Sequence, residues 1–256
     1  MDADQGFPRP WLYGQLASLA YQLDKPVGTS FGDVEFYQDR LAGVTGEVLE
    51  PAVGTGRILI PLLQHGLRVR GYDASAEMLR VCRSNCAARG LDPLLLEADM
   101  VHYSAQGAFE AVVIPAGSFA LVTGRERAAA ALRNAQQSLA SGGRLIVDVE
   151  PPELSAGPFP LRYWWHGDEL LTLTGHGEAD AAAQRMTFWN RYELWRDAEL
   201  IRTELQPLTL QWYGLAEFSA MLSDAGFAQV TVHGDYQAGR HPGRESRVWT
   251  FEATRD

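Results

Sequence analysis

The chain has no long apolar run and no long basic run. None of its hydrophobic stretches approaches the ~20 residues that a membrane-spanning helix needs, and no run of Lys or Arg is longer than two residues. The net charge at pH 7 is −10, which opposes binding to a phosphate backbone. The N-terminal residues MDADQGFPRP are acidic, whereas an export signal starts with a basic region followed by an apolar one. We therefore expect a cytoplasmic protein that binds neither membranes nor nucleic acids.

Cysteine is scarce as well. The two cysteines, Cys82 and Cys86, lie four residues apart on one predicted helix, and no second pair completes a set of metal ligands. We predict two reduced, buried thiols and no metal site. With 256 residues, of which 46% are hydrophobic and 10% aromatic, the chain is long enough for one large domain or for a domain with an insert.

The most informative stretch that is present runs from Glu47 to Asp73. A short apolar run leads into Glu50, and Gly54-Thr55-Gly56 allows the backbone to turn tightly and to approach a ligand. A helix and a second strand follow, and Asp73 ends that strand. An acid at this point of a strand-helix-strand unit can accept hydrogen bonds from both hydroxyls of a ribose. The stretch therefore predicts a site for an adenine nucleoside.

The glycine spacing separates two classes of cofactor. A dinucleotide fingerprint needs a third small residue where this chain has Leu59, and Glu50 suits an ammonium better than a pyrophosphate. The motif EPAVGTG resembles the first motif of the class I S-adenosylmethionine-dependent methyltransferases, with Ala52 in place of its usual first glycine. This resemblance implies S-adenosylmethionine as the methyl donor. A nicotinamide-dependent oxidoreductase is an alternative, disfavoured by Leu59 and by the lack of a Tyr-x-x-x-Lys pair.

Strands and helices continue to alternate as far as residue 160. Apolar strands at residues 94–96, 109–114 and 144–149 alternate with helices at residues 78–88 and 125–139. This order is typical of a doubly wound α/β fold, in which ligands bind beyond the carboxyl ends of the strands. The helix and two strands expected at the C-terminus resemble the end of the methyltransferase sheet. The resemblance implies a Rossmann-like seven-stranded, mostly parallel sheet of order 3-2-1-4-5-7-6 with helices on both faces.

Two further segments are expected to cover this sheet. Residues 1–44 are predicted to form N-terminal cap helices, and residues 45–160 with 214–256 to form the cofactor-binding core. Residues 161–213 break the alternation and predict an antiparallel β insert over the acceptor site. The insert is expected as three β-rich runs, at residues 161–175, 185–196 and 200–213.

The resemblance implies roles for residues along the edge where the strands end. Glu50 is expected to bind the methionine ammonium and Asp73 the ribose hydroxyls, while Asp99 and the Met100 backbone read the adenine amino group. Tyr21 in the cap is a candidate for contact with the methionine end. The full set of expected cofactor-binding residues is Tyr21, Glu50, Ala52, Gly54, Gly56, Asp73, Ala74, Met78, Asp99, Met100 and Gly117.

The acceptor site is predicted from the aromatic insert and from the segment after the fourth strand. Aromatic walls suit an amine cation or a flat ring. On the strand of residues 186–195, Trp189 and Tyr192 face opposite sides, and the sequence leaves open which side lines the pocket. The candidates for the acceptor pocket are Tyr37, Ser118, Phe119, Trp189 and Tyr192. His166 and Glu150 are the candidates for a general base, although an amine that arrives deprotonated needs none.

These residues together predict methyl transfer by in-line displacement to a nitrogen or oxygen nucleophile. Residues 114–119 lack the Asn or Asp that opens the D/N-P-P-Y motif of enzymes acting on nucleic acids and proteins, which favours a small-molecule acceptor. The chain looks most like the branch that acts on amines of sugars and other small metabolites. A non-catalytic protein that binds the nucleoside is the other alternative. The protein is expected to be a monomer or a homodimer.

Overall fold

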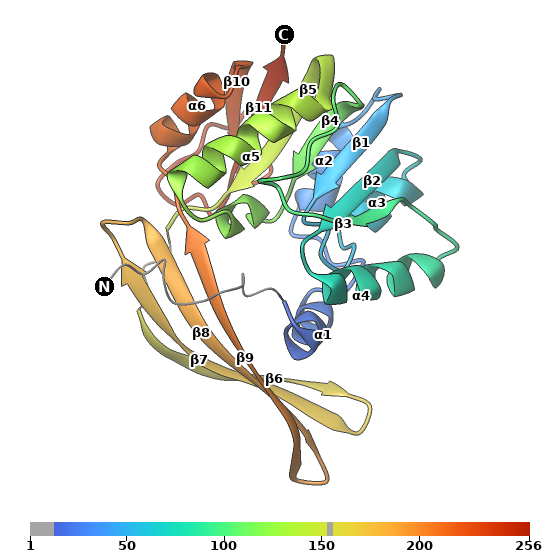
Figure 1. Cartoon of the computed structure of the whole chain (residues 1–256), viewed down its shortest axis with the longest axis vertical. Coiled ribbons are helices and arrows are strands. Elements are labelled where there is room, and N and C mark those ends of the chain that lie inside the picture. Colours follow the sequence, from blue (N-terminus) through green and yellow to red (C-terminus); the bar gives the residue numbers. More distant parts are fainter. Residues whose placement is uncertain (1–12, 153–155) are drawn as a thin grey trace.

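The structure is a computed structural model that describes residues 13–152 and 156–256. The expected N-terminal cap, residues 1–44, is therefore described from Tyr13 onward, and residues 1–12 and 153–155 lie outside the described part. The described chain forms a seven-stranded core sheet and a separate four-stranded insert sheet (Figure 1).

The core sheet confirms the predicted strand order. Its strands are β1 (Glu47–Pro51), β2 (Arg68–Asp73), β3 (Leu95–Glu97), β4 (Phe109–Ile114), β5 (Leu139–Val149), β10 (Phe227–Gly234) and β11 (Trp249–Arg255). They lie in the order β10-β11-β5-β4-β1-β2-β3. The pairs among β1 to β5 are parallel, whereas β11 is antiparallel to both β5 and β10. The two final strands therefore form the expected antiparallel hairpin.

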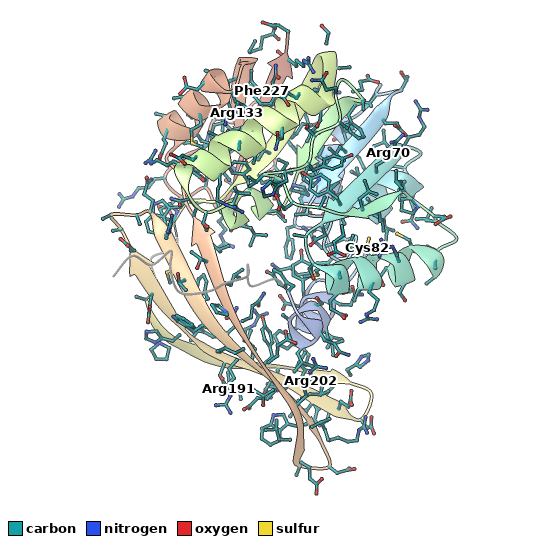
Figure 2. All side chains as sticks on the ribbon, viewed as in Figure 1. Arg70, Cys82, Arg133, Arg191, Arg202 and Phe227 are labelled. Carbon is teal, nitrogen blue, oxygen red and sulfur yellow. The ribbon has the colours of Figure 1, made fainter. Side chains whose placement is uncertain are left out.

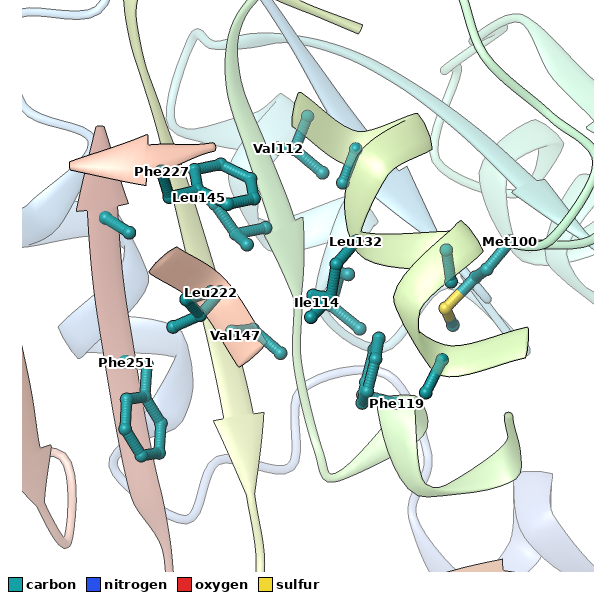
Figure 3. Close-up of a cluster of buried hydrophobic side chains, with 14 of the residues drawn as sticks. Met100, Val112, Ile114, Phe119, Leu132, Leu145, Val147, Leu222, Phe227 and Phe251 are labelled. Atoms are coloured by element: carbon teal, nitrogen blue, oxygen red, sulfur yellow. The ribbon is translucent and has the colours of Figure 1, made fainter. Parts of the chain in front are cut away.

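Helices cover both faces of this sheet. They are α1 (Gln15–Asp24), α2 (Asp33–Arg40), α3 (Leu59–Gln64), α4 (Ala76–Ala87), α5 (Arg125–Ser138) and α6 (Leu215–Asp224), with a short 3-10 helix η1 (Ser118–Leu121). Successive strand residues point to opposite faces, so each central strand must be apolar on both sides. Val112 and Ile114 of β4 pack with Leu132 of α5 and Leu222 of α6 (Figure 3). The other face of β4 packs in the cluster that holds α2, α3 and α4.

The insert sheet differs from its prediction in two respects. Its strands β6 (Gly157–His166), β7 (Glu169–Asp180), β8 (Arg185–Arg196) and β9 (Glu199–Gln211) pair antiparallel in chain order. The run expected at residues 161–175 is two strands, because Gly167, at φ 64°, and Asp168 form a tight turn. A Gly-Asp pair between β-rich runs is a hairpin signal. The insert also begins at Gly157, before the expected start at residue 161.

The first helix lies between the core and the insert sheet (Figure 1). Leu16, Ala17 and Ala20 of α1 form one buried cluster with Leu173 of β7 and Tyr192 of β8. Helix α1 thereby holds the insert sheet beside the core. In the part of the chain that the structure describes, no helix is long and apolar enough to cross a membrane.

Candidate functional site

Four acids lie at the edge of the core sheet where its parallel strands end. Glu50 lies in β1, Asp73 ends β2, Asp99 follows β3, and Asp148 lies one residue before the end of β5. Because β1 to β5 run in one direction, the carboxyl ends of these strands meet at the same edge. The predicted convergence of Glu50, Asp73 and Asp99 is what this topology produces.

The glycine turn after β1 adopts the backbone that its sequence requires. Gly54 and Gly56 have φ values of 54° and 87°, in the left-handed region that favours glycine. Ala52 is also left-handed, with φ 53°, so an alanine here holds a conformation for which glycine is better suited. A Cβ at Gly56 would lie 3.0 Å from the Cys82 sulfur, so α4 can pack closely against the turn. The turn thus places backbone without side chains at the edge of the sheet where the parallel strands end.

Backbone donors orient the carboxylate of Asp73. Its Oδ2 accepts from the Gly54 amide at 2.9 Å and its Oδ1 from the Ser75 amide at 2.8 Å. A carboxylate has about four acceptor sites, so two further hydrogen bonds from a ribose can be accommodated. Burial raises the pKa of Asp73, and the amides of Ser75 and Gly54 oppose that shift because they stabilise the ionised form.

Glu50 is a buried acid that lacks a partner. The residue is 1% exposed, and its Oε2 accepts no hydrogen bond from the described part of the chain. Burial raises the pKa of Glu50 well above its usual range, and the nearby Arg57 opposes that shift. An unpaired buried carboxyl is costly, and a ligand ammonium would remove that cost. Glu50 therefore fits the role predicted for it at the methionine end of S-adenosylmethionine.

Arg57, which no motif had marked, lies beside Glu50. Its Nη2 forms a buried ion pair with Asp33 of α2 at 2.6 Å, and its Nη1 donates to the Thr29 carbonyl at 3.2 Å. Its Nε is buried and has no partner in the described chain. A ligand that carries both an ammonium and a carboxylate would complement Glu50 and Arg57 together. The arginine directly after the second glycine was the available signal.

Two tyrosines of the N-terminal segment cover the glycine turn. Tyr21 Cε1 lies 3.9 Å from the position that a Cβ on Gly54 would take. Tyr13 packs edge to face on Tyr21, with 6.2 Å between ring centres, and its carbonyl accepts from the Ser75 hydroxyl at 2.6 Å. Sequence reasoning missed Tyr13, because a lone tyrosine before a helix carries no pattern.

A cavity of about 500 Å³ extends from these tyrosines between α1 and the insert sheet. This volume lies in the range of small-molecule sites. Its aromatic lining residues are Tyr13, Tyr21, Phe159, Trp164, Phe188 and Tyr192, and its polar ones are Asp24, Lys25, Arg162 and Asn190. Tyr192 thus faces the cavity. Trp189 lies on the opposite face of β8 and is not among the lining residues.

Three other predicted residues lie away from this cavity. Phe119 is 1% exposed and packs in the core, because η1 directs the chain back onto the sheet. Tyr37 of α2 is fully buried in the core cluster on the other face of the sheet. His166 is exposed at the end of β6, beside the hairpin turn and at the end of the insert away from the core (Figure 1). None of the three is among the residues that line the cavity.

The remaining cofactor candidates lie along the edge. Asp99 accepts from the Val101 amide at 2.8 Å, and the Met100 carbonyl accepts from Asn134 Nδ2 at 3.1 Å. Ala74 directly follows Asp73, Met78 is buried in the first turn of α4, and Ser118 opens η1. Gly117 is left-handed at φ 65°, and a Cβ there would lie 2.9 Å from Glu150 Cδ. Glu150 is therefore next to the loop after β4, where its predicted role places it.

Asp148 is a further site residue that was not predicted. It is fully buried, and burial raises its pKa to about 6. Its Oδ2 accepts from the Ala116 amide at 2.8 Å and from the Tyr236 hydroxyl at 2.9 Å, while its Oδ1 accepts from Thr250 Oγ1 at 2.7 Å. Asp148 thus fixes the loop after β4 to β11 and to the loop before it. An acid between Val147 and Val149 was the available signal.

Comparison with known proteins agrees with this geometry. A family model for a methyltransferase domain matches residues 48–143. A demethylmenaquinone methyltransferase from Thermus thermophilus is 36% identical over 131 residues, which are 50% of this chain and 57% of that protein. The match therefore spans little more than half the length of this relative.

Two solved structures are similar over both the core and the insert. The sugar N-methyltransferase KedS8 from Streptoalloteichus is 19% identical, with a TM-score of 0.75 over 100% of this chain and 98% of that one. The amino pentose methyltransferase CalS10 from Micromonospora echinaspora, solved with S-adenosylmethionine, is 20% identical, with a TM-score of 0.68 over 96% and 98%. At these identities, the similarity to the two structures shows that this chain has the same fold. With its first motif, its sheet order and the domain model that matches residues 48–143, the chain carries a methyltransferase domain of the class I, S-adenosylmethionine-dependent type.

Proposed function

We propose that the protein transfers a methyl group from S-adenosylmethionine to a nitrogen or oxygen nucleophile of a small molecule held between α1 and the insert. The observation that carries this proposal is the unpartnered, buried carboxyl of Glu50 beside the left-handed glycine turn. The acceptor cavity begins at Tyr21, which covers that same turn. Bound S-adenosylmethionine supplies a methyl group already activated on a sulfonium, and the bonding electron pair stays on sulfur as the methyl moves to the nucleophile.

The residues of the protein then bind the cofactor and align it with the acceptor. Glu50 and Arg57 hold the methionine end, and Asp73 holds the ribose. Asp99 and Met100 lie where the adenine is expected. Tyr21 separates the cofactor edge from bulk water on the side of α1. Alignment of the reacting atoms and exclusion of water are the two effects by which such a site accelerates methyl transfer.

The domain roles follow from the same arrangement. Residues 45–152 and 214–256 are assigned to the cofactor-binding core, and the insert, which begins at Gly157, to the cover of the acceptor. Support comes from the aromatic residues of the insert that line the cavity, because aromatic faces attract an amine cation and stack on flat rings. The names of KedS8 and CalS10 support a sugar-like amine as acceptor.

Glu150 is the remaining candidate for the proton that the nucleophile loses. It lies at the exposed end of β5 beside Gly117. An ionised acid at that position can orient an ammonium or accept its proton. An amine that arrives neutral releases its proton to water after transfer and needs no base.

The proposal is tested by ligand-dependent melting. S-adenosylhomocysteine at about 100 times its Kd should raise the melting temperature by about 5–10 °C, because it binds only the folded state. NAD should leave it unchanged. The Asp73→Ala variant should bind S-adenosylhomocysteine roughly ten- to hundredfold more weakly, since the hydrogen bonds that the ribose hydroxyls donate to an anionic acceptor are lost. Stabilisation by NAD alone would favour the oxidoreductase alternative. Binding without methyl transfer to any of a panel of amines, amino sugars and phenols would favour the non-catalytic alternative.

A further inference from the structure

A side-chain amide lies among the aromatic walls of the cavity. Asn190 of β8 is only 7% exposed and lines the cavity between Phe188 and Tyr192 on the same face of the strand. The side-chain hydrogen bonds of its strand neighbours Thr187 and Tyr192 go to Thr209 and Gln206, and none of them reaches the Asn190 amide. Most buried polar side chains have a hydrogen-bond partner, and a ligand in the cavity can supply one to Asn190.

The nearest strand and helix neighbours of Asn190 are mostly apolar. Helix α1 presents Ala17 and Ala20 to the cavity, and its polar residues there, Tyr21 and Asp24, lie in its last turns. The cross-strand neighbour on β7 is Gly175, which has no side chain. The cross-strand neighbour on β9 is Gln206, whose Oε1 accepts from the Tyr192 hydroxyl at 3.3 Å.

Gln206 extends the polar character of this part of the sheet. It is 1% exposed, and its Nε2 has no partner in the described chain. Two amides therefore lie opposite each other on neighbouring strands, and only Asn190 is among the cavity residues. Pockets of this kind combine apolar walls with a few polar groups that fix the orientation of the ligand. Asn190 is the residue of this lining that carries a side-chain amide.

We propose that Asn190 selects an acceptor whose ring carries a hydroxyl group close to the reacting nitrogen or oxygen. This inference rests on the proposed function. An amide presents both a donor and an acceptor, and a hydroxyl can bond to both, whereas an unsubstituted ring can bond to neither. A ligand that displaces water from the amide without replacing its hydrogen bonds loses affinity. A site built to bond a hydroxyl therefore rejects the analogue that lacks it.

The first test needs no acceptor. Asn190→Leu replaces the amide by an apolar side chain of similar size. Thr187→Val on the opposite face of β8 removes the 3.0 Å hydrogen bond between the Thr187 and Thr209 hydroxyls and shows what the loss of a structural hydrogen bond does. If the amide serves a ligand, Asn190→Leu should melt at the same temperature as the native protein or higher. A fall of about 4 °C or more, as the loss of a structural hydrogen bond produces, would mean that the amide serves the fold, and the inference would be wrong.

The second test uses two pairs of acceptors that differ by one hydroxyl. The pairs are 2-aminocyclohexanol with cyclohexylamine, and catechol with phenol, each assayed by calorimetric binding and by the S-adenosylhomocysteine produced. The native protein and Thr187→Val should prefer the hydroxylated member of one pair by about tenfold or more, and Asn190→Leu should lose that preference. The inference is overturned if the native protein shows no preference, or if Asn190→Leu retains it.

Binding of S-adenosylhomocysteine separates a failure of the proposed function from a failure of the role of Asn190. All three proteins should bind S-adenosylhomocysteine with the same affinity, because Asn190 and Thr187 lie on the insert and touch none of the cofactor residues. Absence of that binding in the native protein would contradict the proposed function itself. Normal cofactor binding without selection for the hydroxyl would contradict only the role of Asn190.

Discussion

At the scale of single residues, Asp148 illustrates how burial and hydrogen bonding oppose each other. Removal from water raises its pKa to about 6, although donors from Ala116, Tyr236 and Thr250 favour the ionised form. A carboxyl whose pKa is higher in the folded than in the unfolded protein stabilises the fold at low pH. That stabilisation is lost as the pH rises from the ordinary value near 3.8 through about 6.

The variant Asp148→Asn should remove this dependence on pH. Asparagine keeps the shape, its oxygen can accept from Ala116, and its amide can donate to the Thr250 hydroxyl. From pH 4 to pH 7 the unfolding free energy of the native protein should fall relative to that of the variant, by on the order of 3 kcal/mol. Urea unfolding at each pH measures this difference. A constant difference between the two proteins over that range would show that Asp148 has an ordinary pKa.

Spacing along the chain predicted some acids of the site but not others. Glu50 and Asp73 were predictable, because the turn that places them is local and its glycines are visible in the sequence. Asp148 was not, since its three partners come from residues far along the chain and its burial depends on packing between β4 and β11. Arg57 was missed for the same reason, because its partner Asp33 lies in another helix.

At the scale of elements, α1 depends on the insert for its first turn. Glu204 of β9 accepts from the amides of Leu16 and Ala17 at 2.9 and 3.1 Å, in the manner of a helix cap. Arg202 of the same strand donates to Gln15 (Figure 2). Further along α1, Tyr21 lies beside Gly54 of the glycine turn. The helix therefore connects the insert to the cofactor edge.

Changing Glu204 to Ala should affect both the fold and the cofactor. The loss of the cap should lower the unfolding free energy by about 1–2 kcal/mol. The affinity for S-adenosylhomocysteine should fall by roughly three- to tenfold, because the fraction of molecules with α1 in place decreases. Denaturant unfolding and calorimetry measure the two effects, and Glu199→Ala at the exposed start of β9 is the control. Reduced stability with unchanged cofactor affinity would show that Glu204 acts on the fold alone.

For the insert, the sequence pattern of a strand predicts its two faces but not which face points inward. Alternation correctly divided β8 into two faces, with Tyr192 on one and Trp189 on the other. The inner face is the one on which α1 docks, and that contact joins segments more than 150 residues apart in the sequence. The turn at Gly167 was different, because the Gly-Asp pair was present in the sequence as a local signal and was read as part of one long strand.

At the scale of the whole molecule, the core and the insert divide the work of the proposed reaction. The core holds the acids and the glycine turn, while the insert and α1 enclose the cavity. Both units are built around their own buried clusters. Substitutions on the cavity face of the insert, away from α1, should therefore change acceptor use without changing the affinity for the cofactor.

Phe188 and Trp189 provide the last test, since they are adjacent in β8 and face opposite sides. Phe188 lines the cavity and does not belong to the cluster under α1, whereas Trp189 lies on the outer face. On an acceptor that yields S-adenosylhomocysteine, Phe188→Ala should lower kcat/KM by roughly tenfold or more and leave cofactor affinity within about twofold. Trp189→Ala should keep both values and act on stability alone. Equal turnover by the two variants would mean that the acceptor is held outside this cavity, by the loop after β4 at Gly117 and Glu150.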